Sequence, residues 1–340
     1  MLLGRGLVLI HEPLFRAGID PEFRELVRHP AVLPGVSFGA SREILSEGGA
    51  MTVNWGVLWW VVLVLAFAVT ALAETFLPFR SLPTSTARRW FANTVLIVAS
   101  NVALICVYRL SGISLAFTMR GQSHGVLNRV ALPYWAKFAI GFAALDLVAY
   151  VSHRLQHAIG PMWRMHQVHH SETDLDLTTG FRFHPLETLF AESLALAGVA
   201  LLGTPPAAVG FSGLAIIVLD FFEHGNFRIP DRADGILRRL IITPSMHRFH
   251  HSDAVAEQNA NFGTVFSFWD RMFGTYRAGH PAGSVRYGLA DLTDGSETNA
   301  ARLLLLPFRR ASGATLASGP SLDHPGLQTP KTLRTKESAQ

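Results

Sequence analysis

Ten of the fifteen histidines lie between His153 and His251, and most of them recur at short, fixed spacings. The motifs are HRLQH, HQVHH and HRFHH, in which histidines stand three or four residues apart. In a helix, residues at these spacings share one face, so their side chains point toward a common ion. A neutral imidazole offers one lone pair and suits zinc, copper, iron and nickel. The spacing therefore predicts a metal site built from histidine.

The number of histidines indicates more than one ion. The three motifs supply eight imidazoles, and the histidines of FRFHPLE and EHGN raise the number to ten. A structural zinc ion takes about four ligands, so ten fit two ions that keep open positions for oxygen or substrate. The candidate metal ligands are His153, His157, His166, His169, His170, His184, His224, His247, His250 and His251.

Composition and apolar runs place these motifs in a membrane protein. Charged residues make up 16% of the 340 residues, below the roughly 25% of an average soluble domain. About twenty apolar residues suffice to span a bilayer as a helix. We therefore predict an all-α fold, a polytopic membrane helical bundle with a histidine-rich, metal-binding cap. The apolar runs with few charges cover residues 53–73, 91–108, 134–151, 188–202 and 207–222.

The chain divides into three parts by composition. Residues 1–50 mix glycine, proline and charge without a sustained period, which predicts a poorly ordered extension or an upstream start codon. Residues 51–311 are predicted to form the membrane-embedded domain. Its last two apolar runs are joined by GTPP, a turn signal, and fit either two full spans or a buried, re-entrant hairpin. Residues 312–340 are rich in Ser, Thr, Pro and Gly, which predicts a disordered tail.

Cysteine content and charge narrow the functional classes. The single cysteine, Cys106, lies in an apolar run, which excludes a disulfide framework and argues against a thiolate metal site. The net charge is +4, but the basic residues are scattered, which fits a membrane protein better than a nucleic-acid partner. Any metal must therefore be held by histidine and carboxylate.

The order of the motifs resembles a known family. HRLQH, HQVHHS, HPLE and HRFHHS, followed by NFGTVFSFWDRMFGTY, are similar to the motifs of the fatty acid hydroxylase superfamily, also called the sterol desaturase family. The resemblance covers about residues 144–276. It implies an integral-membrane di-iron enzyme that uses O2 to hydroxylate or desaturate a lipid such as a fatty acyl chain or a sterol. It also implies that the eight histidines of the three motifs, together with His224, are iron ligands.

One position departs from the family pattern, since several relatives have HxxxH where this sequence has Asp220 followed by His224. Asp220 supplies a carboxylate ligand there, or His184 completes the set, or the position is unused. Asp146 lies seven residues before His153 and inside an apolar run, where a carboxylate tends to face a functional interior. We expect Asp146, and either Asn261 or Asp270, to hydrogen-bond a ligating imidazole and fix its ring.

Oxygen chemistry of this kind needs electrons, and the sequence shows no flavin, haem or iron–sulfur motif. We therefore expect a separate ferredoxin- or cytochrome-type donor, and place the histidine motifs on the cytosolic side, where such donors would be. Basic residues do not decide the orientation, because both sides carry them. On the motif side they are Arg80, Arg88 and Arg89, and on the other side Arg109, Arg120, Arg129 and Lys137.

Two other functions compete with lipid oxidation. A membrane zinc hydrolase would be expected to carry HExxH, which the sequence lacks. A metal transporter would place its ligands near the middle of the membrane, whereas these motifs lie at the ends of apolar runs and in loops. Hydroxylation is favoured over desaturation, because desaturation must cleave a second, precisely placed C–H bond. The sequence leaves the identity of the lipid open.

Overall fold

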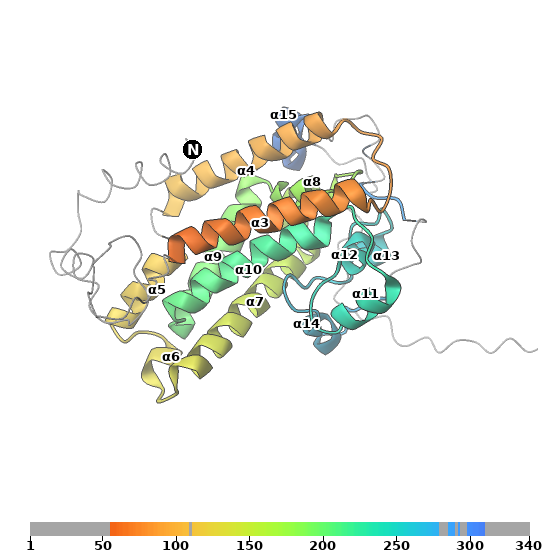
Figure 1. Ribbon diagram of the computed structural model, residues 1–340. Coiled ribbons are helices and arrows are strands. Elements are labelled where there is room, and N and C mark those ends of the chain that lie inside the picture. The colour runs from red at the N-terminus through yellow and green to blue at the C-terminus, as the bar shows by residue number, and fades with distance from the viewer. Residues whose placement is uncertain (1–54, 109–110, 279–284, 290–291, 293–297, 310–340) are drawn as a thin grey trace, which may run out of the picture. The chain divides into compact units, whose positions relative to one another are not determined.

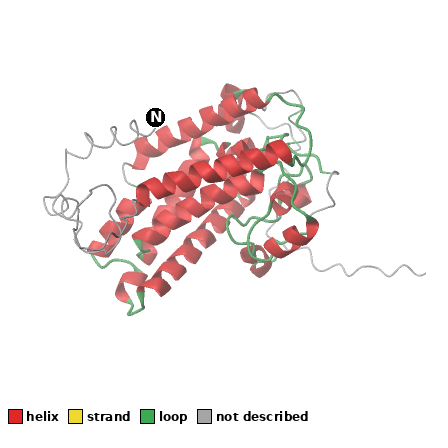
Figure 2. Ribbon diagram, in the orientation of Figure 1, coloured by secondary structure: helices red, strands yellow, loops and turns green. Residues whose placement is uncertain are grey.

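Long, apolar helices dominate the structure, a computed structural model that describes residues 55–108, 111–278, 285–289, 292 and 298–309. These residues form helices and loops, with isolated bridges as their sole β-pairing (Figures 1 and 2). The predicted extension (1–50) and tail (312–340) lie outside the described residues. The long helices are α3 (Trp55–Phe76), α4 (Thr86–Tyr108), α7 (Tyr134–Ala158), α9 (Pro185–Leu202) and α10 (Pro206–His224).

Shorter helices fill the connections between the long ones. The chain forms two units, residues 1–64 and 65–340, and the second unit contains every histidine motif. In the first, the rings of Trp59 and Trp60 meet edge to face at 5.1 Å. The short helices are α5 (Gly112–Gly121), α6 (Val126–Arg129), α8 (Gly160–His170), η1 (Leu177–Phe181), α11 (Asp231–Leu237), α12 (Pro244–His250), α13 (Val255–Gln258), α14 (Phe268–Met272), α15 (Ala300–Leu305) and η3 (Leu306–Phe308).

The long helices expose large apolar side chains along their length. Among the described residues, five helical segments, which lie in α3, α4, α7, α9 and α10 and in the residues after α4, are long and apolar enough to cross a membrane. Val69, Phe91 and Leu201 are all exposed, whereas a soluble protein keeps its apolar side chains mostly inside. A helix that is apolar on every side suits lipid. The all-α, polytopic membrane helical bundle predicted from the sequence is confirmed.

The turn between α9 and α10 is fixed by close backbone contacts. Gly203 ends α9 with a φ of 66°, a left-handed conformation that favours glycine. A Cβ on Gly203 would meet the His124 carbonyl oxygen at 2.6 Å, and one on Gly141 of α7 would lie 2.8 Å from Thr204 Cγ2. The turn therefore packs tightly on α7 and on the segment before α6. Because α9 and α10 run antiparallel from this turn, their other ends, at His184 and His224, return to the same side.

We expect Gly203→Ala to destabilise the protein. The left-handed conformation costs an L-residue roughly 1–2 kcal/mol, and the added methyl group would also press on the His124 carbonyl. Thermal unfolding in detergent should show a lower midpoint. Gly213→Ala, in α10, is the matched control, because a Cβ there meets nothing within 4 Å. Equal midpoints for the two variants would contradict this account of the turn.

Candidate metal centre

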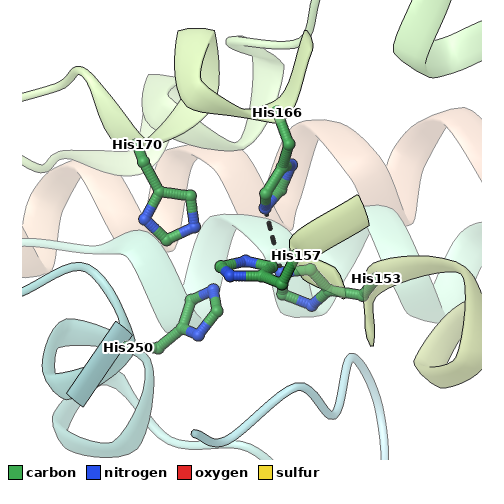
Figure 3. A group of neighbouring side chains, drawn as sticks. All are labelled: His153, His157, His166, His170 and His250. Carbon is green, nitrogen blue, oxygen red and sulfur yellow. Dashed lines mark hydrogen bonds between the residues drawn. The ribbon is translucent and has the colours of Figure 1, made fainter. Parts of the chain in front are cut away.

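Nine of the ten candidate histidines converge into two groups. Within each group, one ring nitrogen of every member lies within 4.8 Å of those of all the others. The rings of the five-histidine group come from α7, α8 and α12 and turn toward one another (Figure 3). The five-histidine group is His153, His157, His166, His170 and His250, and the four-histidine group is His169, His224, His247 and His251.

Each histidine triplet is divided between the two groups. His166 and His170, one helical turn apart on α8, enter the five-histidine group, whereas His169 enters the other. The same holds for HRFHH, in which His250 joins the first group while His247 and His251 join the second. Neighbouring residues on a helix point ~100° apart, so adjacent histidines face different directions. The expectation that each triplet serves one ion is therefore wrong.

The two groups lie side by side. The rings of His170 and His251, one from each group, stack with their centroids 4.5 Å apart. The rings of His166 and His169 also stack, at 5.3 Å. Cations held by the two groups would therefore be close neighbours.

Ring nitrogens within the groups face one another without a bridging protein group. In the four-histidine group, His224 Nε2 lies 2.8 Å from His247 Nε2 and 3.2 Å from His169 Nε2. In the five-histidine group, the buried Nε2 atoms of His157 and His250 have no hydrogen-bond partner. A buried polar atom without a partner costs about 1–3 kcal/mol. A cation between such nitrogens would satisfy their lone pairs, so the residues present fit metal ions.

The outward nitrogens of four rings are held by the protein. An Nδ1–H that donates to the protein leaves Nε2 with its lone pair directed inward, the arrangement that a metal ligand needs. Three of the four acceptors are backbone carbonyls, which stay neutral at any pH. The pairs are His153 with the Phe262 carbonyl at 3.0 Å, His250 with the Ala260 carbonyl at 2.8 Å, His224 with the Asp220 carbonyl at 2.8 Å, and His166 with the Glu187 carboxylate at 2.5 Å.

Glu187 is a site residue to which the sequence analysis gave no role. Its Oε1 accepts from His166 Nδ1, and its Oε2 accepts from the backbone N–H of His184 at 3.4 Å. The carboxylate is buried at the first turn of α9, where negative charge is favourable. The signal was present in HPLE, since a glutamate three residues after a helix cap commonly reaches back to the cap.

His184 lies outside both groups. Its Nδ1 accepts from the Leu186 backbone N–H at 3.2 Å and caps α9. Its Nε2 lies 3.2 Å from the Leu304 carbonyl, which accepts its hydrogen. Both ring nitrogens thus have protein partners, and the ring has no free lone pair to offer a metal ion.

Two carboxylates adjoin the four-histidine group. Asp220, Glu223 and His224 could together hold a cation, although Asp220 belongs to neither histidine group. Glu223 Oε1 lies 3.8 Å from His247 Nδ1, and its Oε2 is buried without a partner. Sequence reasoning singled out Asp220 and missed Glu223, although Glu223 directly precedes His224 in the quoted EHGN motif.

Asp146 does not contact an imidazole. Its carboxylate accepts from the backbone N–H groups of Val265 and Phe266, at 3.0 and 3.1 Å, and from Trp269 Nε1 at 2.8 Å. The expected hydrogen bond from a ligating imidazole is therefore replaced by three bonds to the segment around residue 266. The reason is one of distance, because seven residues separate Asp146 from His153 by about 10 Å along α7.

Asn261 and Asp270 act through the backbone and not through an imidazole. Asn261 Nδ2 donates to the carbonyls of Met246 and Arg277, at 3.3 and 3.1 Å. Asp270 accepts from the N–H groups of Phe262 and Gly263, at 2.7 and 2.9 Å. Asp270 thereby fixes the two peptide units that flank Phe262, and the second of them contains the Phe262 carbonyl that accepts from His153.

Burial keeps the histidines of the cap neutral. Removal from water, reinforced by the neighbouring imidazoles, lowers the pKa of each ring well below its ordinary value of 6.5. A neutral imidazole is the form that binds metal. The rings concerned are His166, His169, His170, His247, His250 and His251.

A buried arginine holds the end of α8, which carries three of the ligand candidates. Arg182 is fully buried and donates to the Val168 carbonyl and to Ser171 Oγ, both at 2.9 Å. It also pairs with Glu172 at 3.3 Å and bonds Asn93 of α4. These contacts lock the last turn of α8 against a membrane helix, so the directions of its histidines are set by buried polar bonds.

Comparison with known proteins agrees with this geometry. Residues 138–275 match the family described as fatty acid hydroxylase. This part of the chain is a domain of the fatty acid hydroxylase superfamily. The resemblance noted in the sequence is thereby confirmed. The matched residues include every histidine of both groups.

Curated relatives of the fatty acid hydroxylase domain modify lipids, as their names state. The chain is 33% identical over 144 residues to ornithine lipid hydroxylase OlsE of Rhizobium tropici. This match covers 42% of this chain and 43% of the relative. It is 30% identical over 148 residues to alkylglycerol monooxygenase of Homo sapiens, and this match covers 44% of this chain and 32% of the relative. The chain thus matches less than half the length of these relatives. No solved structure matches significantly.

We expect Glu187→Gln to weaken metal binding. The substitution keeps the shape of the side chain but leaves one acceptor oxygen for two donors, His166 Nδ1 and the His184 backbone N–H, and losses of this kind typically cost ~10–100-fold in affinity. Competition with a chelator measures the change. Glu192→Gln, on the same helix, is the control, because Glu192 has no hydrogen bond to an imidazole among the described residues. Equal affinities in the two variants would refute the role of Glu187.

Asp270→Asn should loosen the loop that holds His153. An amide has one acceptor oxygen, so it cannot serve both the Phe262 and Gly263 N–H groups, and a buried donor without a partner costs about 1–3 kcal/mol. We expect a lower unfolding midpoint and less bound metal. Asp253→Asn, which removes an ion pair with the exposed Arg286, is the control and should change neither. Unchanged metal content in Asp270→Asn would contradict the coupling to His153.

Proposed function

We propose that the chain is an O2-dependent monooxygenase that hydroxylates a membrane lipid and holds two iron ions. The observation that carries this proposal is the pair of adjacent histidine groups, in which nine largely buried imidazoles meet with ring nitrogens that have no other partner. The fatty acid hydroxylase domain and the lipid-hydroxylating relatives support the reaction class.

The five-histidine group would hold one iron and the four-histidine group the other. Imidazole is a suitable ligand for iron. His184 is left out of the proposed set, because both of its nitrogens are bonded to the protein. Asp220 and Glu223 lie next to the four-histidine group, the group with fewer ligands, so a carboxylate from this pair is the candidate for an additional ligand there.

The reaction needs an oxidant and a source of electrons. When bound, the iron pair supplies the redox chemistry that activates O2 toward an unactivated C–H bond. The balance is one O2, two electrons and two protons for each lipid, giving a hydroxylated lipid and water. We propose that a ferredoxin- or cytochrome-type protein delivers the electrons, because the sequence carries no motif for a flavin, haem or iron–sulfur cluster.

Groups of the protein orient the metal-binding rings, exclude water and offer an apolar surface to the lipid. The Phe262 and Ala260 carbonyls and the Glu187 carboxylate fix three rings of the five-histidine group from outside. Burial of the rings keeps water away, which strengthens electrostatic interactions and limits side reactions. The apolar surfaces of α7 and α10, which position His153, His157 and His224, suit the hydrocarbon chain of a lipid.

The substrate proposal stops at the class of lipid. The relatives are named for an ornithine lipid and an alkylglycerol, both amphiphiles with a polar head, so we propose a polar membrane lipid. We also propose that the histidine groups face the cytosol, where the electron donor would be.

Substitution of one ligand in each group should remove iron from that group. We expect His250→Ala and His247→Ala each to lower bound iron from about two ions per chain to about one, and to abolish hydroxylation. Elemental analysis of purified protein measures the metal. His184→Asn is the matched control, because asparagine also caps a helix and His184 lies outside both groups. Loss of iron in the control, or full iron in both alanine variants, would sink the assignment.

Lipid hydroxylation is tested with heavy-oxygen gas. Cells that make the protein should accumulate a lipid with one labelled oxygen atom, and cells that make His250→Ala should not, because the reaction needs the five-histidine group. Mass spectrometry of total lipid extracts gives the answer. A product two hydrogens lighter and without label would establish desaturation instead. An unchanged lipid profile with iron bound would refute the lipid as substrate.

A further inference from the structure

The position of Asp146 along α7 sets a depth in the membrane. Asp146 is the midpoint of α7, twelve residues from Tyr134 and twelve from Ala158. At 1.5 Å per residue, α7 is about 37 Å long, which exceeds the ~30 Å hydrocarbon core by about 7 Å. Even if all of this excess projects on the histidine side, Asp146 lies about 10 Å inside the hydrocarbon boundary. Tilting the helix only shortens the projecting part.

The groups that bind Asp146 come from a segment far along the chain. The Val265 and Phe266 N–H groups and Trp269 Nε1 donate to its carboxylate. The Phe266 ring meets that of Phe142, a further turn away from the histidines, at 5.6 Å. Residues 262–266, from the Phe262 carbonyl at His153 to the Phe266 N–H at Asp146, therefore run down the histidine-side half of α7, to a level below the lipid headgroups.

A second segment is joined to the first by backbone bonds. The Ile242 N–H donates to the Val265 carbonyl, and the Ser267 N–H donates to the Leu240 carbonyl, at 3.2 and 3.0 Å. Residues 231–242 and 265–273, which include α11 and α14, are here called the shelf. The two helices lie near each other beside one end of the long helices (Figure 1).

The outer surface of the shelf combines apolar and basic side chains. Ile236, Leu240 and Met272 are 68%, 59% and 64% exposed, and the exposure of apolar side chains to water is unfavourable. Two exposed arginines accompany them, Arg232 and Arg239, whereas the guanidinium of Arg271 donates to Ser267 and to the Arg238 carbonyl. Of the acidic residues of the shelf, Asp234 and Asp270 are buried and hydrogen-bonded, which leaves Asp231 exposed. Arginine beside apolar residues suits the boundary between acyl chains and lipid phosphates.

We propose that the shelf is inserted into the headgroup layer on the histidine side, with Ile236, Leu240 and Met272 among the upper acyl carbons and the exposed arginines on the phosphates of anionic lipids. Depth and surface chemistry both support this partner. Phe262 lies just before residue 265, where the second part of the shelf begins, and its ring lies 5.0 Å from that of His157. The lipid layer thus meets the cap close to the five-histidine group. The proposal holds whichever metal the histidines bind.

Site-directed fluorescence measures the immersion of the shelf. A polarity-sensitive dye is attached to Met272→Cys in the full-length protein, with the single native cysteine removed by Cys106→Ser, and the protein is reconstituted in vesicles. Val255→Cys is the matched control, since Val255 is an exposed apolar residue of the cap on α13, outside the shelf. We expect lipids with a headgroup-proximal nitroxide to quench the dye at position 272 strongly, and aqueous iodide to quench it much less than the dye at position 255. Equal iodide quenching at the two positions would overturn the proposal.

The phosphate contacts are tested with lipid composition. Adding phosphatidylglycerol to phosphatidylcholine vesicles should deepen the dye at Met272→Cys further, and the double substitution Arg232→Gln with Arg239→Gln should abolish this response because it removes two exposed charges. No response to anionic lipid in the parent protein would refute the role of the arginines. Shielding from iodide that arises only when an acidic electron-donor protein is added would show that the shelf is a protein-docking surface and not a membrane one.

Discussion

Nine imidazoles are brought together where water is largely excluded, and their inward nitrogens have little to bond except one another or a cation. Such an arrangement is unfavourable by itself, because lone pairs that face each other repel and buried polar atoms without partners are costly. The remaining structure can be understood as the framework that makes it tolerable. Rigid helices hold the rings in place, and carbonyls and one carboxylate occupy their outer nitrogens.

The outer bonds are divided between two kinds of acceptor. Backbone carbonyls hold His153, His224 and His250, so these rings depend on the path of the chain and not on a charge. Glu187 holds His166 and lies at the first turn of α9, where the helix itself favours negative charge. Asp270 and Asn261 stabilise the loop that carries two of the carbonyls. Asp270, which was expected to hydrogen-bond an imidazole, thus acts through the peptide unit whose carbonyl accepts from His153.

Membrane depth and site geometry are linked through α7. One end of this helix supplies His153 and His157, and its midpoint holds Asp146. The segment of residues 262–269 packs along α7 between these two levels. The same segment provides the Phe262 carbonyl to His153 and continues to the exposed Met272 of the shelf. The tight turn at Gly203 fixes α9 and α10 against α7, so that His224 reaches the same end of the helices.

The sequence by itself determined the features that depend on local spacing and composition. Long apolar runs specify membrane helices whatever their neighbours are, and histidines at three- and four-residue spacings share a helix face. The class of fold, the histidines that could bind metal and the family therefore followed from the printed residues. Asp220, beside His224, was likewise visible as a candidate.

Tertiary structure alone decided which nitrogens face which. The division of each triplet between two groups depends on the angle at which α8 and α12 approach α7, and the spacing along one helix does not contain that angle. His184 left the candidate set because Leu304, 120 residues away, takes its second nitrogen. Asp146 likewise accepts from a distant residue, the backbone N–H of Phe266, 120 residues along the chain. Hydrogen bonds act over about 3 Å, so contacts between such distant residues exist only once the chain has folded.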